Sequence, residues 1–420
     1  MNLRPRPRAV PETGMLDRQD ERLSTATGLA GESRQLWRRV RTGDIGSLPV
    51  IIGLILIAVV FQSLNPLFLS SVNLVNLMLD SAAVGTIAVG VVLILLLAQI
   101  DLSIGSVSGF AAAILAVTFV QLQWPLWLSL LLPVVMGVIV GYIYSFLFLH
   151  FGVPSFVSTL GGLLAIFGFQ LFILGTNGSI NLPFDSLIVR FAQKMFLAPV
   201  TAYVLVVLIA AGYVAVALSA ARKRVRADLS APSYLGIWIK GALLVVILGF
   251  ITWYLNLSRG VAVMFVVFLA IIAVVAYALK RTQWGRAMYA IGGNVEAARR
   301  AGIRVNRVYL SAFILSSVLA AVGGLFAAGR LAAATLSSGT NDVNLDAIAA
   351  AVIGGTSLFG GRGNAQSALL GILVIEAIAS GLNLLNLDSS IRFMVTGGVL
   401  IVAVVVDSLS RRSRAAHGTA

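Results

Sequence analysis

Long apolar segments are the feature that most constrains how this chain can fold. A helix that crosses a bilayer needs about 20 mainly apolar residues, because the hydrocarbon offers no partner for an exposed backbone group. About twelve segments meet this length: residues 47–68, 74–99, 103–121, 125–149, 154–176, 199–220, 234–255, 259–279, 308–334, a shorter one at 344–359, 365–385 and 390–409. The sequence therefore predicts an all-α polytopic membrane protein, with some of its transmembrane helices short or broken.

The charge distribution favours the same class of protein. Charged residues make up 11% of the chain, whereas a soluble domain averages roughly a quarter, and this excludes an ordinary soluble enzyme. A net charge of +14 would suggest nucleic acid in a soluble protein, but here the basic residues cluster beside apolar segments with few aromatic residues between them. Such clusters orient a chain in a membrane, so we expect no nucleic-acid partner.

Counting spans from a cytoplasmic N-terminus gives the side on which each loop lies. Every crossing changes the side, and cytoplasmic loops carry an excess of Lys and Arg. The basic segments that then fall in the cytoplasm are the loops 222–232 and 280–307, the turn at Arg362 and the tail 411–414. Three isolated basic residues fall on the other side: Arg190, Lys194 and Arg259. The sequence therefore predicts that both termini are cytoplasmic.

The two ends of the chain are predicted to lie outside the membrane region, which covers residues 47–409. Residues 1–46 alternate arginines with acidic residues and contain early prolines, as is typical of a disordered tail. This segment is too long and too acidic to open a cleaved signal peptide, so we expect the first span to be retained. Residues 410–420 form a second, basic tail.

Residues 183–197 are predicted to form a helix in the outer membrane interface. Its apolar face would consist of Phe184, Ile188, Phe191 and Met195. Such a helix either caps the bundle of spans or receives an external partner.

The basic loop 280–307 contains the signals of a short helix. Asn294 suits an N-cap, Glu296 suits the positive end of the helix dipole, and Gly302 suits a C-terminal stop. The resulting helix has about two turns and is too short to be stable in water alone, so it must pack on something. Its small residues and charges would face a partner, or else the ends of its own spans: Ala297, Ala298, Ala301, Arg299 and Arg300.

Polar residues mark a broken helix near Asp101. An acidic residue between two apolar runs is costly unless it faces protein or water, and Ser103 and Ser106 follow it. The stretch either lines a cavity with freed backbone groups and hydroxyls, or Asp101 simply caps the next helix. The next polar group along the chain, Ser155, Ser158 and Thr159, opens another span and either faces a passing solute or packs between helices.

Several kinds of active site are excluded. The chain has no cysteine, so thiol chemistry and disulfides are impossible, and its two histidines cannot form a metal cluster. The Gly-rich stretch 350–364 lacks the Lys-Ser or Lys-Thr of a phosphate-binding loop, and close helix approach with a tight turn explains it better. Glu376 lies centrally in its span and would suit a proton relay, which keeps an ion-driven secondary transporter as an alternative.

Four stretches in order carry a resemblance to a known family. They are LLLAQIDLSIGSVSG (95–109), VPSFVSTLGG (153–162), the loop 280–307, and AAVIGGTSLFGGRGN (350–364). Together they resemble permease subunits of ATP-binding cassette importers in the branched-chain amino acid and monosaccharide permease superfamily. An extra segment at 222–256 resembles the xylose-type subgroup. Ala98 and Gln99 depart from the family, which commonly has glycines there.

The resemblance implies a function and its partners. The chain would be a non-catalytic permease that carries a monosaccharide, such as the pentose xylose, across the bacterial inner membrane. Residues 294–302 would couple it to a separate ATPase that binds ATP and Mg²⁺, and Asp101, Ser103, Ser106, Ser155, Ser158 and Thr159 would line the sugar pathway. A periplasmic sugar-binding protein and a second copy of the chain would complete the importer. The rivals are the secondary transporter and a membrane enzyme for lipid-linked substrates, which needs clustered carboxylates or histidines that the sequence lacks.

Overall fold

The computed structural model describes residues 48–388, 390–391, 393–399, 401–402 and 405. The predicted tails 1–46 and 410–420 therefore lie outside the described residues. The described residues divide into two compact units, which are described separately: residues 198–254, and the described residues before 198 and after 254. Helices dominate both units, as the sequence predicts.

In the described residues, nine helices are long and apolar enough to cross a membrane. They are α3 (Ser71–Leu96), α4 (Ile104–Ala116) with its π-helical end (Val117–Gln121), α5 (Leu126–His150), α6 (Ser155–Leu174), α8 (Pro199–Arg226), α9 (Tyr234–Asn256), α10 (Val263–Arg281), α13 (Val305–Leu331) and α15 (Ala365–Leu384). The shorter α2 (Leu48–Leu64) precedes them. These helices match the predicted spans to within a few residues and confirm a polytopic all-α membrane fold.

Two predicted spans differ from the structure in extent. The segment predicted at 344–359 is α14 (Asn341–Ile353), whose 13 residues rise only about 20 Å against a hydrocarbon core of about 30 Å. It ends early because Gly355 turns the backbone into the left-handed region, with φ +101°. Of the last predicted span, 390–409, the structure describes helical residues at 390–391, 393–399, 401–402 and 405, and the others lie outside the description.

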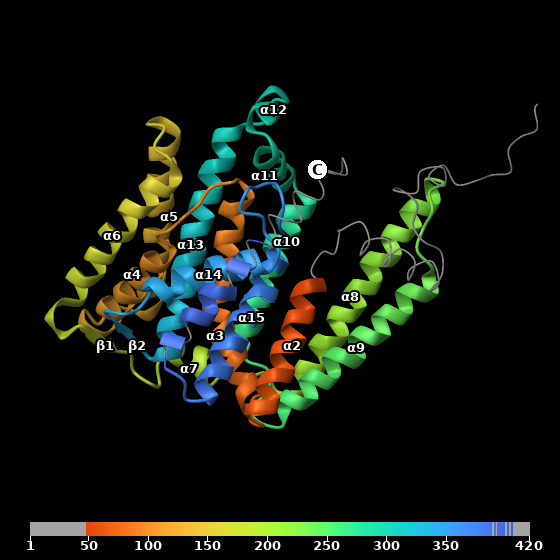
Figure 1. Cartoon of the computed structure of the whole chain (residues 1–420), viewed down its shortest axis with the longest axis horizontal. Helices are drawn as coiled ribbons and strands as arrows, with labels where there is room; N and C mark the ends of the chain where they lie inside the picture. The colour runs from red at the N-terminus through yellow and green to blue at the C-terminus, as the bar shows by residue number, and fades with distance from the viewer. Residues whose placement is uncertain (1–47, 389, 392, 400, 403–404, 406–420) are drawn as a thin grey trace, which may run out of the picture. The chain divides into compact units, whose positions relative to one another are not determined.

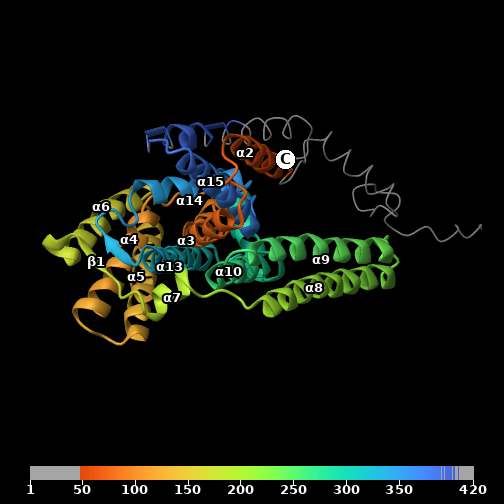
Figure 2. The ribbon, with the colours of Figure 1, turned by 90° about the horizontal axis from the view of Figure 1, so that it is seen from below.

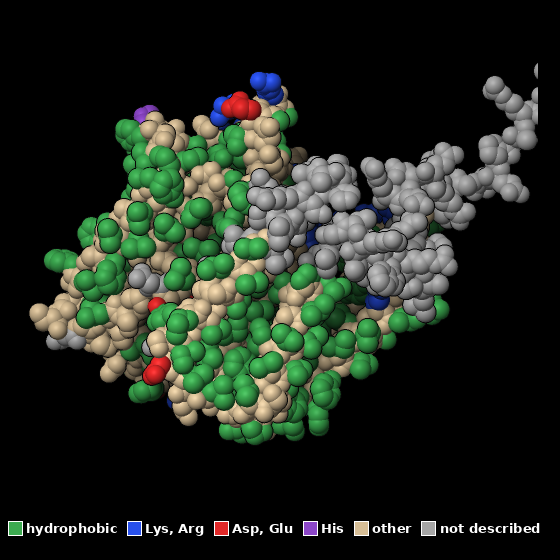
Figure 3. Space-filling view, viewed as in Figure 1, with side chains coloured by type: hydrophobic (Ala, Val, Ile, Leu, Met, Phe, Trp, Pro, Cys, Tyr) green, Lys and Arg blue, Asp and Glu red, His purple; other side chains and the backbone are tan. Residues whose placement is uncertain are grey.

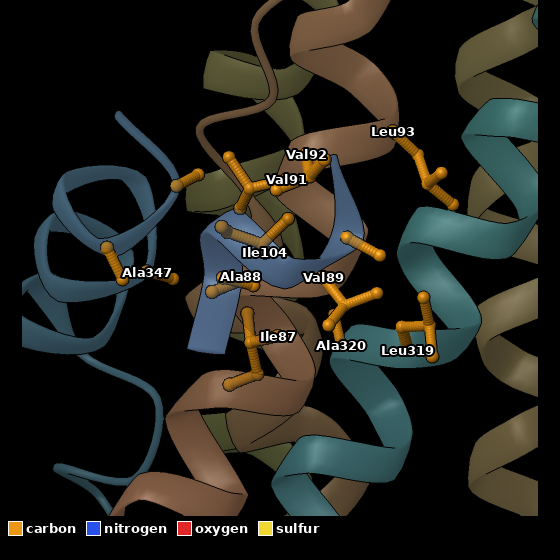
Figure 4. Close-up of a cluster of buried hydrophobic side chains, with 14 of the residues drawn as sticks. Ile87, Ala88, Val89, Val91, Val92, Leu93, Ile104, Leu319, Ala320 and Ala347 are labelled. Carbon is orange, nitrogen blue, oxygen red and sulfur yellow. The ribbon is translucent and has the colours of Figure 1, made fainter. Parts of the chain in front are cut away.

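The core of the larger unit forms where α3 and α13 pack together (Figure 1). Most of α3 is buried, and Figure 4 shows its side chains meeting those of α4, α13 and α14. In Figure 2, α5 lies on one side of this pair and α14 and α15 on the other. The α3–α13 contact is close because Gly90 sits against the backbone of Ser316, at a distance that leaves no room for a side chain.

Short elements close the unit at the end of α13 (Figure 1). Strand β1 (Ser179–Asn181), which follows the 3₁₀ turn Gly175–Asn177, pairs antiparallel with β2 (Ala333–Thr335). Helix α7 (Leu187–Gln193) packs on α13. The apolar face predicted for residues 183–197 is therefore partly wrong: Phe184 precedes the helix and is 67% exposed, whereas Val189 and Ala192 are buried. Contact with α13, rather than the interface alone, decides which residues of α7 turn inward.

The smaller unit is a helical hairpin formed by α8 and most of α9. The two helices meet through Val214, Ala221 and Ile237, and Gly241 lets α9 approach Val214. Large apolar side chains cover the rest of both helices, as expected for a hairpin surrounded by lipid. The last turn of α8 is basic, with Lys223, Arg224 and Arg226.

Candidate functional site

The predicted short helix in the basic loop is α12 (Val295–Arg300). The Asn294 side-chain oxygen accepts a hydrogen bond of 2.9 Å from the amide of Ala297, which confirms the predicted N-cap. Gly302 has φ +81°, the left-handed conformation that commonly ends a helix. Both ends of α12 are therefore specified by its own sequence.

The faces of α12 differ in part from the prediction. Ala298 is buried in the main core cluster, so it holds the helix to the bundle and is absent from the exposed surface. Ala297 and Ala301 are exposed, as is Arg300. Arg299 and Glu296 form an ion pair of 3.0 Å, and because both are mostly exposed it adds at most about 1 kcal/mol. Figure 3, viewed as Figure 1, shows blue and red side chains gathered over α12.

A second helix in the same loop, α11 (Gln283–Gly293), is a feature that sequence reasoning missed. Its N-cap is Thr282, whose hydroxyl accepts from the amide of Gly285 at 3.2 Å. The indole Nε1 of Trp284 donates to the Ser311 hydroxyl on α13 at 2.7 Å. The signal was present in Thr282 and in the apolar residues that follow it at helical spacing. Helix α11 fastens the loop to α13.

Tyr289 joins α11 to the Gly-rich segment. Its hydroxyl donates a 2.8 Å hydrogen bond to the carbonyl oxygen of Gly363. Burial raises the pKa of the Tyr289 phenol above its ordinary value, so the group stays protonated and remains a donor at neutral pH. The loop containing α11 and α12 is thus attached to α13 on one side and to the segment after α14 on the other.

The Gly-rich segment after α14 packs against the end of α3. The amide of Gly361 donates to the carbonyl oxygen of Leu96 at 2.9 Å. Gly292, at the end of α11, lies against the same carbonyl and against Gly361, where a side chain would not fit. This arrangement confirms the predicted close approach and tight turn. Ala98 adopts φ +56° beside Gly360.

The broken helix predicted near Asp101 lies between the end of α3 at Leu96 and the start of α4 at Ile104. Asp101 is buried, and its Oδ1 accepts from both the amide and the hydroxyl of Ser103, at 2.8 and 2.7 Å. Its Oδ2 has no hydrogen-bond partner among the described residues. Ser103 is itself the N-cap residue of α4 and no side-chain cap hydrogen bond is present there, so Asp101 stabilises the turn before α4 and does not cap the helix as one of the two predicted roles required.

Hydroxyl groups at the start of α6 also form hydrogen bonds with the backbone between α3 and α4. Ser155 Oγ accepts from the amide of Ile100 at 3.3 Å, and Thr159 Oγ1 accepts from the amide of Leu102 at 3.2 Å. These two residues thus replace hydrogen bonds that the interrupted helix loses. Ser158 donates to the carbonyl oxygen of its own helix residue Pro154 at 3.1 Å. Hydrogen bonds bring four of the predicted pathway residues to the break, Asp101, Ser103, Ser155 and Thr159, and all six are buried, Ser106 and Ser158 included.

Asn344 on α14 is a further site residue that the sequence did not reveal. Its Oδ1 accepts a hydrogen bond from the amide of Gly105, in the first turn of α4. The side chain is 7% exposed. A lone asparagine near the start of an apolar helix gives no indication of which distant helix it will cap, so no sequence signal was available.

At the other end of α13, charges within the membrane region pair with one another. Arg330 Nε and Asp80 Oδ1 lie 2.8 Å apart, and Arg330 and Arg259 both donate to the side-chain oxygen of Asn76. Pairing lowers the cost of placing such charges at membrane depth. Among the described residues, no group of three or more His, Cys, Asp or Glu could hold a metal ion.

Comparison with known proteins gives matches over most of the chain. Residues 73–404 match the family described as branched-chain amino acid transport system / permease component. The xylose transport system permease protein XylH of Escherichia coli K12 is 34% identical over 345 residues, which cover 82% of this chain and 87% of the relative. Its counterpart in Haemophilus influenzae is 33% identical and covers 87% and 98%, respectively. The ribose import permease RbsC of Bacillus subtilis is 30% identical and covers 87% and 94%. No matching solved structure was found.

Proposed function

The chain belongs to the permease-component family of branched-chain amino acid transport systems, and from this membership we propose that it carries a pentose of the xylose type into the cell. It is the membrane-spanning, non-catalytic subunit of an ATP-binding cassette importer for a monosaccharide. The observation that supports xylose is the alignment with xylose permeases over nearly their whole length, at higher identity than with ribose permeases.

We propose that α12 is the surface that a cytoplasmic ATPase contacts. Three features support this role: the helix projects from the bundle, it is capped at both ends, and its exposed side carries charges. The docking residues would be Asn294, Glu296, Ala297, Arg299, Arg300 and Gly302, with Ala298 as the anchor that holds the helix in place. ATP and Mg²⁺ would bind to the ATPase.

Movement of α12 would reach the membrane region through contacts on its neighbour α11. Tyr289 binds the Gly-rich segment through Gly363, and this segment continues from α14. Helix α14 in turn holds the first turn of α4 through Asn344 and Gly105. A displacement of the loop by the ATPase would therefore act on the broken helix near Asp101. This is a chain of packed elements between two sites, and the substitutions below test its coupling.

The six buried residues at the break would contact the sugar when the pathway opens. In the closed arrangement the side-chain oxygens of Asp101, Ser155 and Thr159 accept hydrogen bonds from backbone amides of the break, and the Ser103 hydroxyl donates to Asp101. Sugar hydroxyls both donate and accept hydrogen bonds, so they could replace these bonds during passage. Asp101, with its unpartnered Oδ2 among the described residues, is the strongest candidate acceptor for a sugar hydroxyl.

The remaining assignments concern partners and orientation. We propose that a periplasmic sugar-binding protein delivers the substrate and that two copies of the chain form the pathway. Both termini, the loop 280–307 and the basic end of α8 would face the cytoplasm. The membrane region would span residues 47–409, with 222–256 as a xylose-type insertion and with tails at 1–46 and 410–420.

Reconstitution tests the proposal. The chain would be placed in liposomes with its ATPase and sugar-binding protein, and uptake of labelled xylose and ribose would be measured with ATP supplied on the ATPase side. We expect xylose uptake that needs all three proteins and ATP and that is insensitive to ionophores. Uptake by the chain alone in response to an ion gradient would instead establish a secondary transporter. Ribose uptake without xylose uptake, using binding proteins for each sugar, would refute the pentose assignment alone.

A further inference from the structure

Helix α7 and the C-cap residue that follows it, Lys194, carry a basic pair that the proposed function does not explain. Arg190 and Lys194 are exposed and lie one helical turn apart. Among the described residues, neither side chain forms an ion pair or a hydrogen bond, although Asp185 is nearby in the sequence. Helix α7 lies at the opposite end of α13 from α12 (Figure 1), so in the proposed orientation, on which this inference rests, these cations stand on the membrane side that usually has fewer of them. Topology alone gives no reason for their presence.

An apolar cavity of about 370 Å³ adjoins the same helix. Leu187 and Phe191 line it from α7, Val134 lines it from α5, and Phe326 lines it from α13. The cavity is partly open, and its lining is almost entirely apolar. Its volume falls at the lower end of the range for pockets that hold small molecules.

The position of the cavity relative to the cations matches the shape of a phospholipid. Phe326 lies within the last two turns of α13, so the cavity lies below the end of this helix and at the depth of acyl chains. On α7, the exposed stripe with Arg190 and Lys194 borders the stripe with Leu187 and Phe191. Long basic side chains can extend toward the headgroup region while their stems stay on apolar surface.

We propose that α7 and this cavity bind an anionic phospholipid of the leaflet opposite the coupling loop. The phosphate group accepts hydrogen bonds from Arg190 and Lys194, and one acyl chain occupies the cavity between α5, α7 and α13. An anionic lipid is favoured over a zwitterionic one because the two cations have no acidic partner among the described residues.

A bound lipid at this place would brace one end of α13. Gln193 of α7 donates to the carbonyl oxygens of Gly329 and Arg330, at 3.3 and 2.8 Å. Arg330 in turn pairs with Asp80 on α3. Occupation of the cavity would therefore stiffen the contact between α7 and the two central helices. This inference does not depend on the transported sugar and can be tested by lipid binding alone.

Native mass spectrometry of the full chain in detergent measures such binding directly. The probes are dioleoyl phosphatidylglycerol and dioleoyl phosphatidylcholine, added in increasing amounts. We expect one phosphatidylglycerol to bind more tightly than phosphatidylcholine. Arg190→Gln with Lys194→Gln should weaken phosphatidylglycerol binding about thirty-fold, from about 1 kcal/mol for each cation near an anionic surface. The matched control is Arg300→Gln with Arg304→Gln, which removes two exposed cations of equal spacing from the coupling loop and should leave this binding unchanged.

Two further variants test the cavity with the charges intact. Val134→Phe fills it from α5, and Leu187→Trp covers its mouth from an exposed position that tolerates a larger residue. Each should lower phosphatidylglycerol binding, provided that the variant elutes from gel filtration as the native chain does. Equal binding of the two lipids, or normal binding by the Arg190/Lys194 variant, would overturn the proposal. So would a phenotype in which this variant loses only the sugar-binding protein, or in which the cavity variants lose only self-association.

Discussion

Gly302 offers the sharpest test of the coupling helix, because its substitution changes the backbone and little else. At this position φ is +81°, and a Cβ would meet no atom within 4 Å. Gly293, at the end of α11, is equally open, but its φ lies outside the left-handed region. The same change, glycine to alanine, therefore strains the chain at one position and not at the other.

The two substitutions should act differently on the stability of the loop: one should lower it and the other should not. An L-residue in the left-handed region costs about 1–2 kcal/mol, and the reduced freedom of the unfolded alanine chain returns about 0.4–1 kcal/mol. Gly302→Ala should thus destabilise the formed α12 by about 1 kcal/mol, or about five-fold in its equilibrium with a frayed loop. Gly302→Val should cost more because its side chain is β-branched. Gly293→Ala should be neutral or should stabilise α11 by up to about 1 kcal/mol.

Hydrogen exchange and transport read out this difference. In reconstituted importer, amides of residues 295–302 should exchange about five-fold faster in Gly302→Ala than in the native chain, if exchange follows the opening equilibrium. Uptake should fall in the order native, alanine, valine, while Gly293→Ala transports normally. The reasoning would be refuted by Gly302→Val with native exchange and native uptake. Equal impairment by Gly293→Ala would show that any added side chain in the loop disturbs the ATPase contact.

Three other substitutions address the contacts behind the loop. Asn344→Ala leaves the buried amide of Gly105 without its acceptor and should cost about 1–3 kcal/mol, seen as a lower unfolding temperature in detergent. Asn344→Asp keeps an acceptor oxygen and should therefore avoid most of this loss. Ala98→Gly relieves a φ of +56° and should raise the unfolding temperature slightly; a decrease would contradict the strain argument. Tyr289→Phe removes a 2.8 Å hydrogen bond worth about 0.5–1.5 kcal/mol and should lower uptake per ATP hydrolysed. Because the folded phenol has a raised pKa, the advantage of Tyr289 should be constant at neutral pH and shrink only as pH rises above about 10, where the unfolded tyrosine ionises.

The membrane architecture was largely predictable from the sequence. Hydropathy over about 20 residues reports directly on insertion, so helices such as α3 and α10 appear near their predicted bounds. The bounds and buried faces of short elements were harder to predict from the sequence. The end of α14 depends on how Gly355 turns beside neighbouring helices, and the buried face of α7 depends on α13. A hydropathy pattern does not identify these neighbours.

The candidate site divides in a similar way. Asn294 and Gly302 were identified because capping depends on residues within one helical turn. The inward position of Ala298 was missed, since the three alanines of this segment look alike until the surface beneath the helix is known. Helix α11 was also missed, although Thr282 and its apolar spacing indicated it.

The sequence by itself determined a multi-span membrane protein with a short capped helix in a basic loop, because insertion and capping are decided by neighbouring residues. Only the tertiary structure decided how that loop connects to the broken helix. Tyr289 and Gly363 are separated by 74 residues, and Gly105 and Asn344 by 239. Residues so far apart in sequence form a hydrogen bond only when their helices pack side by side. Which helices are adjacent depends on the shapes of whole helix surfaces and not on any one segment.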